Sequence, residues 1–273
     1  MQRSVLALAL LAGAALSGGP ASAMPTYDGF GDYTTGATLP SQPGGGYGWN
    51  GAWGGGGLDV TVAAPGLAFP GLDTSPGAAT SSAPVVNTVA WYWRDVQPGI
   101  GDGTTFYLSF LLRPEIAISD YGGLSIWGSA GSIFIGESGA AAGGSHAYGL
   151  EANVTSAIIA SSSVMASPGE TALLVLKATL GVGPDLFELF VNPLPGTSEA
   201  DNLVAASFDT AMGLDLGNLT FIAINNEGNW TTDEIRIGAS FASVTPMTVP
   251  TPAPAALLLL GQILLLARGR QAR

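Results

Sequence analysis

Glycine and proline interrupt this chain at such short intervals that it has no room for long amphipathic helices. The sequence contains 40 glycines and 18 prolines in 273 residues. Between these interruptions lie short runs of β-branched, aromatic and aliphatic residues, bounded by Gly, Pro, Asn or Asp. Such runs predict strands, and many short strands separated by turn residues are typical of a β-sandwich or barrel. We therefore expect an all-β fold.

Several strands can be placed by their alternation of apolar and polar residues. The segment 104–113 puts four apolar residues on one face: Phe106, Leu108, Phe110 and Leu112. The segment 171–180 is apolar on both faces, as a central sandwich strand should be. In 233–238, Ile235 and Ile237 point to one side. Further strands are expected at 124–127 and 132–136, which would form a hairpin, and at 186–191, 219–225 and 241–244.

Two segments are expected to lie outside regular structure. The stretch 43–57 is very rich in glycine but carries Tyr47, Trp49 and Trp53. A flexible linker would lack these large rings, so we expect them to pack back on a sheet edge. Residues 75–84 are predicted to be an exposed loop.

Both ends of the chain have the character of targeting segments. Residues 1–23 have a basic start, an uncharged apolar run and the small-residue motif Ala21-Ser22-Ala23, and we interpret them as a signal peptide removed by signal peptidase. Residues 247–273 combine a proline-rich box, a short apolar helix and terminal arginines. The run is shorter than the roughly 20 residues that span a bilayer comfortably, so we expect a transient membrane anchor. Residues 24–246 between them are predicted to form one exported domain.

Charge is divided sharply between the domain and the ends. All 20 acidic residues but only four of the eight basic residues lie within residues 24–246, which gives that part a formal charge of −16. A surface of this sign repels phosphate backbones, so nucleic-acid binding is not expected. The chain has no cysteine, which excludes thiol catalysis and thiolate metal sites.

The C-terminal segment resembles a PEP-CTERM sorting signal of the Val-Pro-x-Pro-Ala type. The matching residues are Val249, Pro250, Pro252 and Ala253, followed by an apolar run and then by Arg268 and Arg270. Thr251 stands where the family usually has Glu. The resemblance implies a Gram-negative bacterium, processing by an exosortase, a transient inner-membrane tether, and a final place at the cell surface or in extracellular exopolysaccharide.

The body of the chain resembles the concanavalin A-like, laminin-G-like jelly rolls. The resemblance rests on 27–30 with 48–53 as the opening, on 108–113 as a central strand and on 230–244 as the closing segment. It implies a sandwich of two antiparallel sheets. The signal helix and the short apolar helix of the tail would flank it.

A glycan-cleaving enzyme is a further alternative, because the resembled fold also hosts glucanases. Two carboxylates on one strand would need alternate positions, as in Glu-x-Asp-x-Glu, and no such triplet occurs. Asp185 and Glu188 are expected to face opposite ways, as are Asp233 and Glu234, although acids from distant strands could still meet. The single histidine, His146, is expected at the surface. We therefore predict a domain that is not an enzyme.

Calcium is the metal that this sequence could hold, because it takes carboxylate and carbonyl oxygens. Jelly rolls of the resembled kind often hold one calcium ion. Asp28 and Asp233 lie in the matched opening and closing segments, and the first and last strands of a jelly roll are usually close. We predict that these two acids share a calcium site. The alternative is that Asp28 caps a turn and Asp233 merely begins a strand.

Aromatic side chains suggest a carbohydrate ligand, because the C–H faces of sugar rings stack on indole rings. Trp91 and Trp93 share one face of a strand and Tyr92 takes the other, so one face can pack in the core while the other contacts a sugar ring. Trp49, Trp53 and Trp127 carry the same two interpretations. The function first expected is a non-catalytic matrix protein associated with exopolysaccharide. A calcium-dependent carbohydrate-binding module is the alternative, and a glycan hydrolase is a third.

Overall fold

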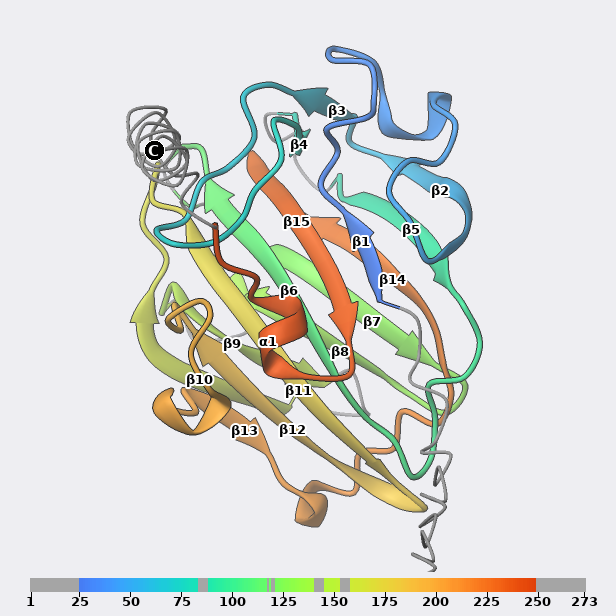
Figure 1. Cartoon of the computed structure of the whole chain (residues 1–273), viewed down its shortest axis with the longest axis vertical. Helices are drawn as coiled ribbons and strands as arrows, with labels where there is room; N and C mark the ends of the chain where they lie inside the picture. The colour runs from blue at the N-terminus through green and yellow to red at the C-terminus, as the bar shows by residue number, and fades with distance from the viewer. Residues whose placement is uncertain are drawn as a thin grey trace, which may run out of the picture.

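The computed structural model describes residues 25–82, 88–116, 118, 121–139, 145–152 and 158–248. The predicted signal peptide, residues 1–23, lies outside these ranges, as do the residues of the predicted sorting signal from Val249 onward. The described residues form two antiparallel sheets packed face to face, with β15, β6 and β11 nearest the viewer in Figure 1 and β7, β8 and β14 behind them.

The front sheet has eight strands, seven of them in the order β13-β12-β11-β6-β15-β4-β3, with β1 also paired to β15. Their bounds are β1 Thr26–Asp28, β3 Val60–Ala63, β4 Ala78–Ser81, β6 Thr105–Pro114, β11 Ala172–Gly181, β12 Gly183–Val191, β13 Ala206–Phe208 and β15 Trp230–Gly238.

The back sheet has seven strands in the order β10-β9-β8-β7-β14-β5-β2. They are β2 Trp49–Gly57, β5 Ala90–Val96, β7 Gly122–Gly128, β8 Ser132–Glu137, β9 Ala147–Ala152, β10 Ile158–Met165 and β14 Leu219–Asn226. Short 3-10 turns occur at η1 Leu39–Ser41, η3 Glu199–Asp201 and η4 Thr210–Met212, and the one α-helix among the described residues is α1 Phe241–Val244.

The main core lies between the sheets and follows the alternation read from the sequence. Phe106, Leu108, Phe110 and Leu112 of β6 all belong to it. The opposite face of β6 and β11 is also covered: Leu111 and Leu173 pack there beneath Phe241 and Val244 of α1. This explains why 171–180 is apolar on both sides. The helix α1 therefore covers part of the outer face of the front sheet.

The all-β prediction and the two antiparallel sheets are confirmed, but three local predictions are wrong: those for 241–244, for 78–81 and for the glycine-rich segment, of which 49–57 form β2. Residues 241–244 form α1 instead of a strand, because Ser240 and Ser243 form a reciprocal capping box that closes a helical turn. Residues 78–81, placed in an exposed loop, form β4, which is largely buried between β15 and β3. Ala and Thr are small, so they leave little hydrophobic signal in the sequence.

The glycine-rich segment forms an edge strand in its own right. Trp49 and Trp53 of β2 are buried in the main core, in line with the expectation that the rings pack against a sheet. Tyr47, just before β2, is 57% exposed. Among the described residues, no helix is long and apolar enough to cross a membrane.

Candidate functional site

The outer face of the back sheet carries a cluster of large aromatic side chains. Trp91 and Trp93 of β5 lie on it, because the alternate residues Ala90 and Tyr92 point into the core. Strand register then places Asn225, Ala223 and Phe221 of β14 beside Trp91, Trp93 and Asp95. On the next strand, Trp127 of β7 pairs with Phe221. We call Trp91, Trp93, Trp127 and Phe221 the aromatic platform.

Three rings of the platform are in direct contact. The Trp127 and Phe221 rings are stacked, with centroids 5.6 Å apart and planes 10° from parallel. The Trp91 ring meets Trp127 edge-on at 5.8 Å. These are favourable aromatic geometries, so each ring limits the motion of the next. Trp93 is the most open of the four, with 39% of its surface exposed. Three of the four rings thus form one continuous aromatic surface.

Glycines of the edge strand β2 keep the space beside the platform clear. Gly54 pairs with Trp93, and Gly56 pairs with Trp91. A Cβ atom at Gly54 would lie 3.0 Å from Cε2 of Trp93, so the indole rests directly on this glycine. A Cβ at Gly56 would meet nothing within 4 Å. The glycines therefore let Trp93 lie across the sheet edge and leave open room next to Trp91.

Polar groups continue the same face away from β5. The Asn225 side chain donates to Ser125 Oγ at 3.1 Å. Strand pairing continues one row across the sheet from Trp93 to Ala223 of β14 and then to Ser125 of β7. The same row passes through Phe134 of β8 and ends at Glu151 of β9. Burial raises the pKa of the Glu151 carboxyl above its ordinary value. At a strand spacing of about 4.8 Å, the row from Trp93 to Glu151 is roughly 19 Å long.

Tyr92 does not belong to this face. Its side chain is only 3% exposed and packs between the sheets. The prediction that it is a glycan contact is therefore corrected, because strand alternation sends it into the core while sending its two neighbours outward. His146 is half-buried, with Nδ1 3.3 Å from Oε1 of the buried Glu137.

Asp28, predicted as a calcium ligand, is engaged inside the sandwich. It forms an ion pair with Arg94 at 2.5 Å, and both side chains are almost fully buried. The same carboxylate accepts hydrogen bonds from the Tyr33 hydroxyl at 2.8 Å and from Trp53 Nε1 at 2.9 Å. Arg94 comes from β5 of the back sheet, so this cluster ties β1 to the opposite layer. Its chemistry is that of a structural ion pair.

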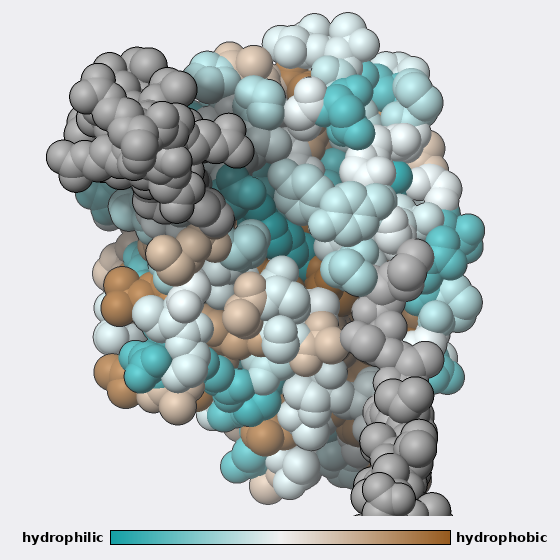
Figure 2. Space-filling model, in the orientation of Figure 1, coloured by the Kyte–Doolittle hydropathy of each residue, from teal (hydrophilic) through white to brown (hydrophobic). Residues whose placement is uncertain are grey.

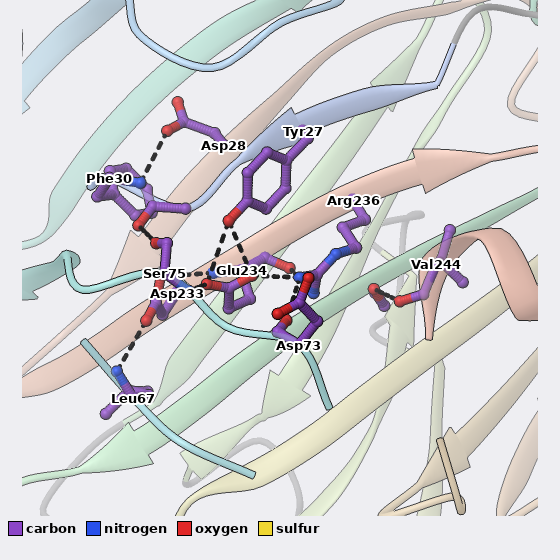
Figure 3. A network of polar contacts seen from close by, with 12 residues as sticks. Tyr27, Asp28, Phe30, Leu67, Asp73, Ser75, Asp233, Glu234, Arg236 and Val244 are labelled. Carbon is purple, nitrogen blue, oxygen red and sulfur yellow. Dashed lines mark hydrogen bonds and ion pairs between the residues drawn. The ribbon is translucent and has the colours of Figure 1, made fainter. Parts of the chain in front are cut away.

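Asp233 faces the other side of the front sheet. Its carboxylate accepts hydrogen bonds from the backbone N–H groups of Leu67 at 2.8 Å and Glu234 at 2.7 Å. Figure 3 shows Asp28 turned away from this group. The structure therefore does not bring together the two acids from which the calcium site was predicted. Among the described residues, no three His, Asp or Glu side chains gather closely enough to hold a metal.

A β-bulge puts Asp233 and Glu234 on the same side, although adjacent residues of a regular strand diverge. The pairing of β15 with β6 shifts between Asp233 and Arg236, and Glu234 adopts a left-handed backbone with φ of 55°. The Glu234 carboxylate consequently meets the Tyr27 hydroxyl, the Ser75 N–H and the Arg236 guanidinium (Figure 3). The prediction that these two acids diverge is wrong for this reason.

The comparisons with known proteins concern the fold. No family model and no curated protein sequence matches the chain. Among solved structures, it is similar to an endo-beta-1,4-glucuronan lyase from the fungus Trichoderma reesei, with 11% identity, a TM-score of 0.48, and 82% of this chain and 98% of that one covered. It is also similar to an endo-1,3-beta-glucanase from Streptomyces sioyaensis, with 12% identity, a TM-score of 0.44, and coverages of 77% and 94%.

A third similar structure is the carbohydrate-binding module CBM66 from Bacillus subtilis, with 9% identity, a TM-score of 0.40, and coverages of 68% and 94%. At such identities the likeness concerns the fold alone.

The prediction that the domain is not an enzyme is wrong, because it rested on the absence of a single strand motif. The similar structures are mostly glycoside hydrolases and lyases, so the absence of a Glu-x-Asp-x-Glu strand gives no basis for excluding catalysis on this fold. Those likenesses do not establish catalysis either. Glu151, a desolvated carboxyl on the face of the aromatic platform, is the acid to replace first when cleavage of a bound glycan is tested.

Proposed function

We propose that this domain binds carbohydrate on the outer face of its back sheet, with the aromatic platform as the contact surface. The observation that carries the proposal is the contact among the Trp91, Trp127 and Phe221 rings on the outer face, with the exposed Trp93 on the same face. The C–H faces of sugar rings stack on such rings, while the partly exposed side chains of Asn225 and Glu151 offer hydrogen-bonding groups to the sugar hydroxyls.

The ligand we propose is neutral. Each of the four basic residues of the domain is engaged by a carboxylate: Arg94 by Asp28, Arg113 by Glu115, Lys177 by Glu188 and Glu199, and Arg236 by Glu234. The domain as a whole is strongly acidic. Uronate or sulfated glycans would meet repulsion that these paired cations do not offset.

We further propose that the protein is exported and held at the envelope by its C-terminal segment until an exosortase processes it. The support is the signal peptide and the tail from Val249 to Arg273. Glycan binding would then place the domain in the exopolysaccharide with which such signals are associated.

Affinity electrophoresis against soluble polysaccharides tests the binding proposal. We expect the chain to be retarded by at least one neutral polymer among β-1,3-glucan, xylan and arabinan, and not by polyglucuronate. Trp93→Ala should weaken binding roughly tenfold or more, because truncating an aromatic hot-spot residue costs about 2 kcal/mol and each ~1.4 kcal/mol is a factor of ten in affinity. Ser161→Ala is the matched control: Ser161 is exposed on β10 of the same sheet, far from the platform. Equal binding by both variants would refute the platform.

A further inference from the structure

Two adjoining pockets open on the opposite side of the molecule, over the outer face of the front sheet. One, of about 430 Å³, is lined by residues of β1, of the loop before β4, of β15 and of α1, among them Thr26, Asp73, Arg236 and Ser243. The other, of about 340 Å³, includes Asp32. Both pockets share Tyr27, Tyr47 and Ser75. We call the two pockets together the tyrosine groove. Figure 2 shows this face, where hydrophilic residues line a hollow next to β1.

The exposed ring of Tyr47 is held rigidly over the groove. Its backbone exchanges two hydrogen bonds of 2.9 Å with Tyr27, and the two rings lie 5.6 Å apart. Gly46 before it has φ of 64°, and a Cβ there would lie 2.0 Å from the Tyr27 carbonyl oxygen, so only glycine allows this approach. Tyr47 nevertheless leaves 57% of its surface in solvent. A large ring fixed by the backbone yet left open is what a contact surface requires.

The floor of the groove is equally fixed. The Arg236 guanidinium lies over the Tyr27 ring, 5.0 Å from its centroid, and donates to the Glu234 carboxylate and to the Asp73 carbonyl. Its charge is neutralised by Glu234, so it gives the groove no net attraction for an anion. Thr26, Thr74, Ser75 and Ser243 also line the groove, and the exposed side chain of Asp73 lies at its wall. The hydroxyls of Thr26, Ser75 and Ser243 donate to backbone carbonyls, which fixes these side chains.

From these features we propose that the tyrosine groove is a second carbohydrate-binding site, which takes a neutral sugar unit with one face against Tyr47. An exposed aromatic ring at the rim, beside the exposed side chains of Asp32 and Asp73, matches a sugar, which can stack one face on the ring and hydrogen-bond along its edge. This inference rests on the proposed function. Because the groove and the aromatic platform lie on opposite sheets, one domain would hold two glycan chains at once and cross-link them.

Isothermal titration of the chain with short neutral oligosaccharides, hexamers of β-1,3-glucan, xylan and arabinose, tests the second site. We expect two sites per chain across this panel, one lost in Tyr47→Ala, the other lost in Trp93→Ala, and both lost in the double variant. With the matching polymers, only the wild type and the Ser161→Ala control should raise solution viscosity. Thermal melts confirm that each variant is folded.

The possible failures are distinct. If no oligosaccharide binds the wild type, the proposed function fails and the second site fails with it. If the wild type binds at one site that Trp93→Ala abolishes and Tyr47→Ala leaves intact, the platform stands and the tyrosine groove is overturned. Unchanged viscosity of the polymers with a protein that shows two sites would overturn the cross-linking.

Discussion

At the residue scale, buried carboxylates define this domain more than any single hydrophobic residue. Asp28, Asp233 and Glu234 are all fully buried, yet their surroundings differ. Asp28 has a direct ion pair with Arg94, whereas Asp233 accepts only backbone N–H groups, and its neighbour Glu234 takes the arginine. Removing one partner of a buried pair leaves an uncompensated charge. Burial raises the pKa of both Asp28 and Asp233, and the Arg94 charge opposes this rise at Asp28.

Asp233 should make the protein less stable as pH rises. Burial, with a smaller contribution from the nearby Glu234 charge, raises the pKa of Asp233 to about 9. Because this exceeds the value of about 3.9 in an unfolded chain, the folded state keeps the proton that the unfolded state releases. The free energy of unfolding should thus fall between about pH 4 and pH 9.

Thermal melts at one-unit steps from pH 5 to pH 9 measure this effect. Asp233→Asn should flatten the decline, since amide nitrogen does not titrate, and Asp95→Asn on the exposed outer face of β5 should leave it as in the wild type. Parallel curves for wild type and Asp233→Asn would contradict the assignment. The same melts with added calcium and with EDTA test calcium binding. Identical melting temperatures in the two conditions would show that calcium does not stabilise the domain.

At the scale of single elements, β2 shows how a low-complexity segment acquires a defined role. Its two tryptophans enter the core, and its glycines leave the outer face flat beside β5. Glycine usually weakens a strand interior. In β2, the pairing with β5 offsets this cost, and the Trp93 indole needs the space that a side chain at Gly54 would fill.

Gly54→Ala and Gly56→Ala form a matched pair of variants for this strand. The methyl group at Gly54 would press on the Trp93 indole at 3.0 Å, whereas the one at Gly56 would enter open space. We expect Gly54→Ala to weaken glycan binding several-fold while its melting temperature stays close to that of Gly56→Ala. Affinity electrophoresis and thermal melts measure the two quantities, and equal binding by both variants would argue against a seated Trp93.

At the scale of the whole molecule, the sandwich separates two candidate ligand surfaces by the thickness of its core. Part of the outer face of the front sheet is covered by α1, which packs there in a second apolar cluster. The tyrosine groove therefore lies on the uncovered part of this face, beside β1. The outer face of the back sheet carries the aromatic platform. Two binding surfaces on opposite faces are the arrangement that the proposed cross-linking of two glycan chains requires.

The proposed envelope tether is tested on the full chain in a Gram-negative host that encodes an exosortase. Deleting residues 247–273 should move the protein from the membrane fraction to the soluble exported fraction, as followed by fractionation and immunoblotting. Thr251→Glu, which restores the residue usual in the resembled signal, should keep the wild-type distribution. Membrane association that survives the deletion would count against the tail as the anchor.

The sequence by itself determined the all-β class and the core faces of the long strands, because side-chain alternation is a local property that burial on one face imposes. It also placed Trp91 and Trp93 on one face and Tyr92 on the other. Only the tertiary structure decided which face enters the core, since that depends on what packs against it. The bulge at Glu234, the pairing of Asp28 with Arg94 from 66 residues away, and the tyrosine groove likewise depend on contacts between distant segments, which no local pattern records.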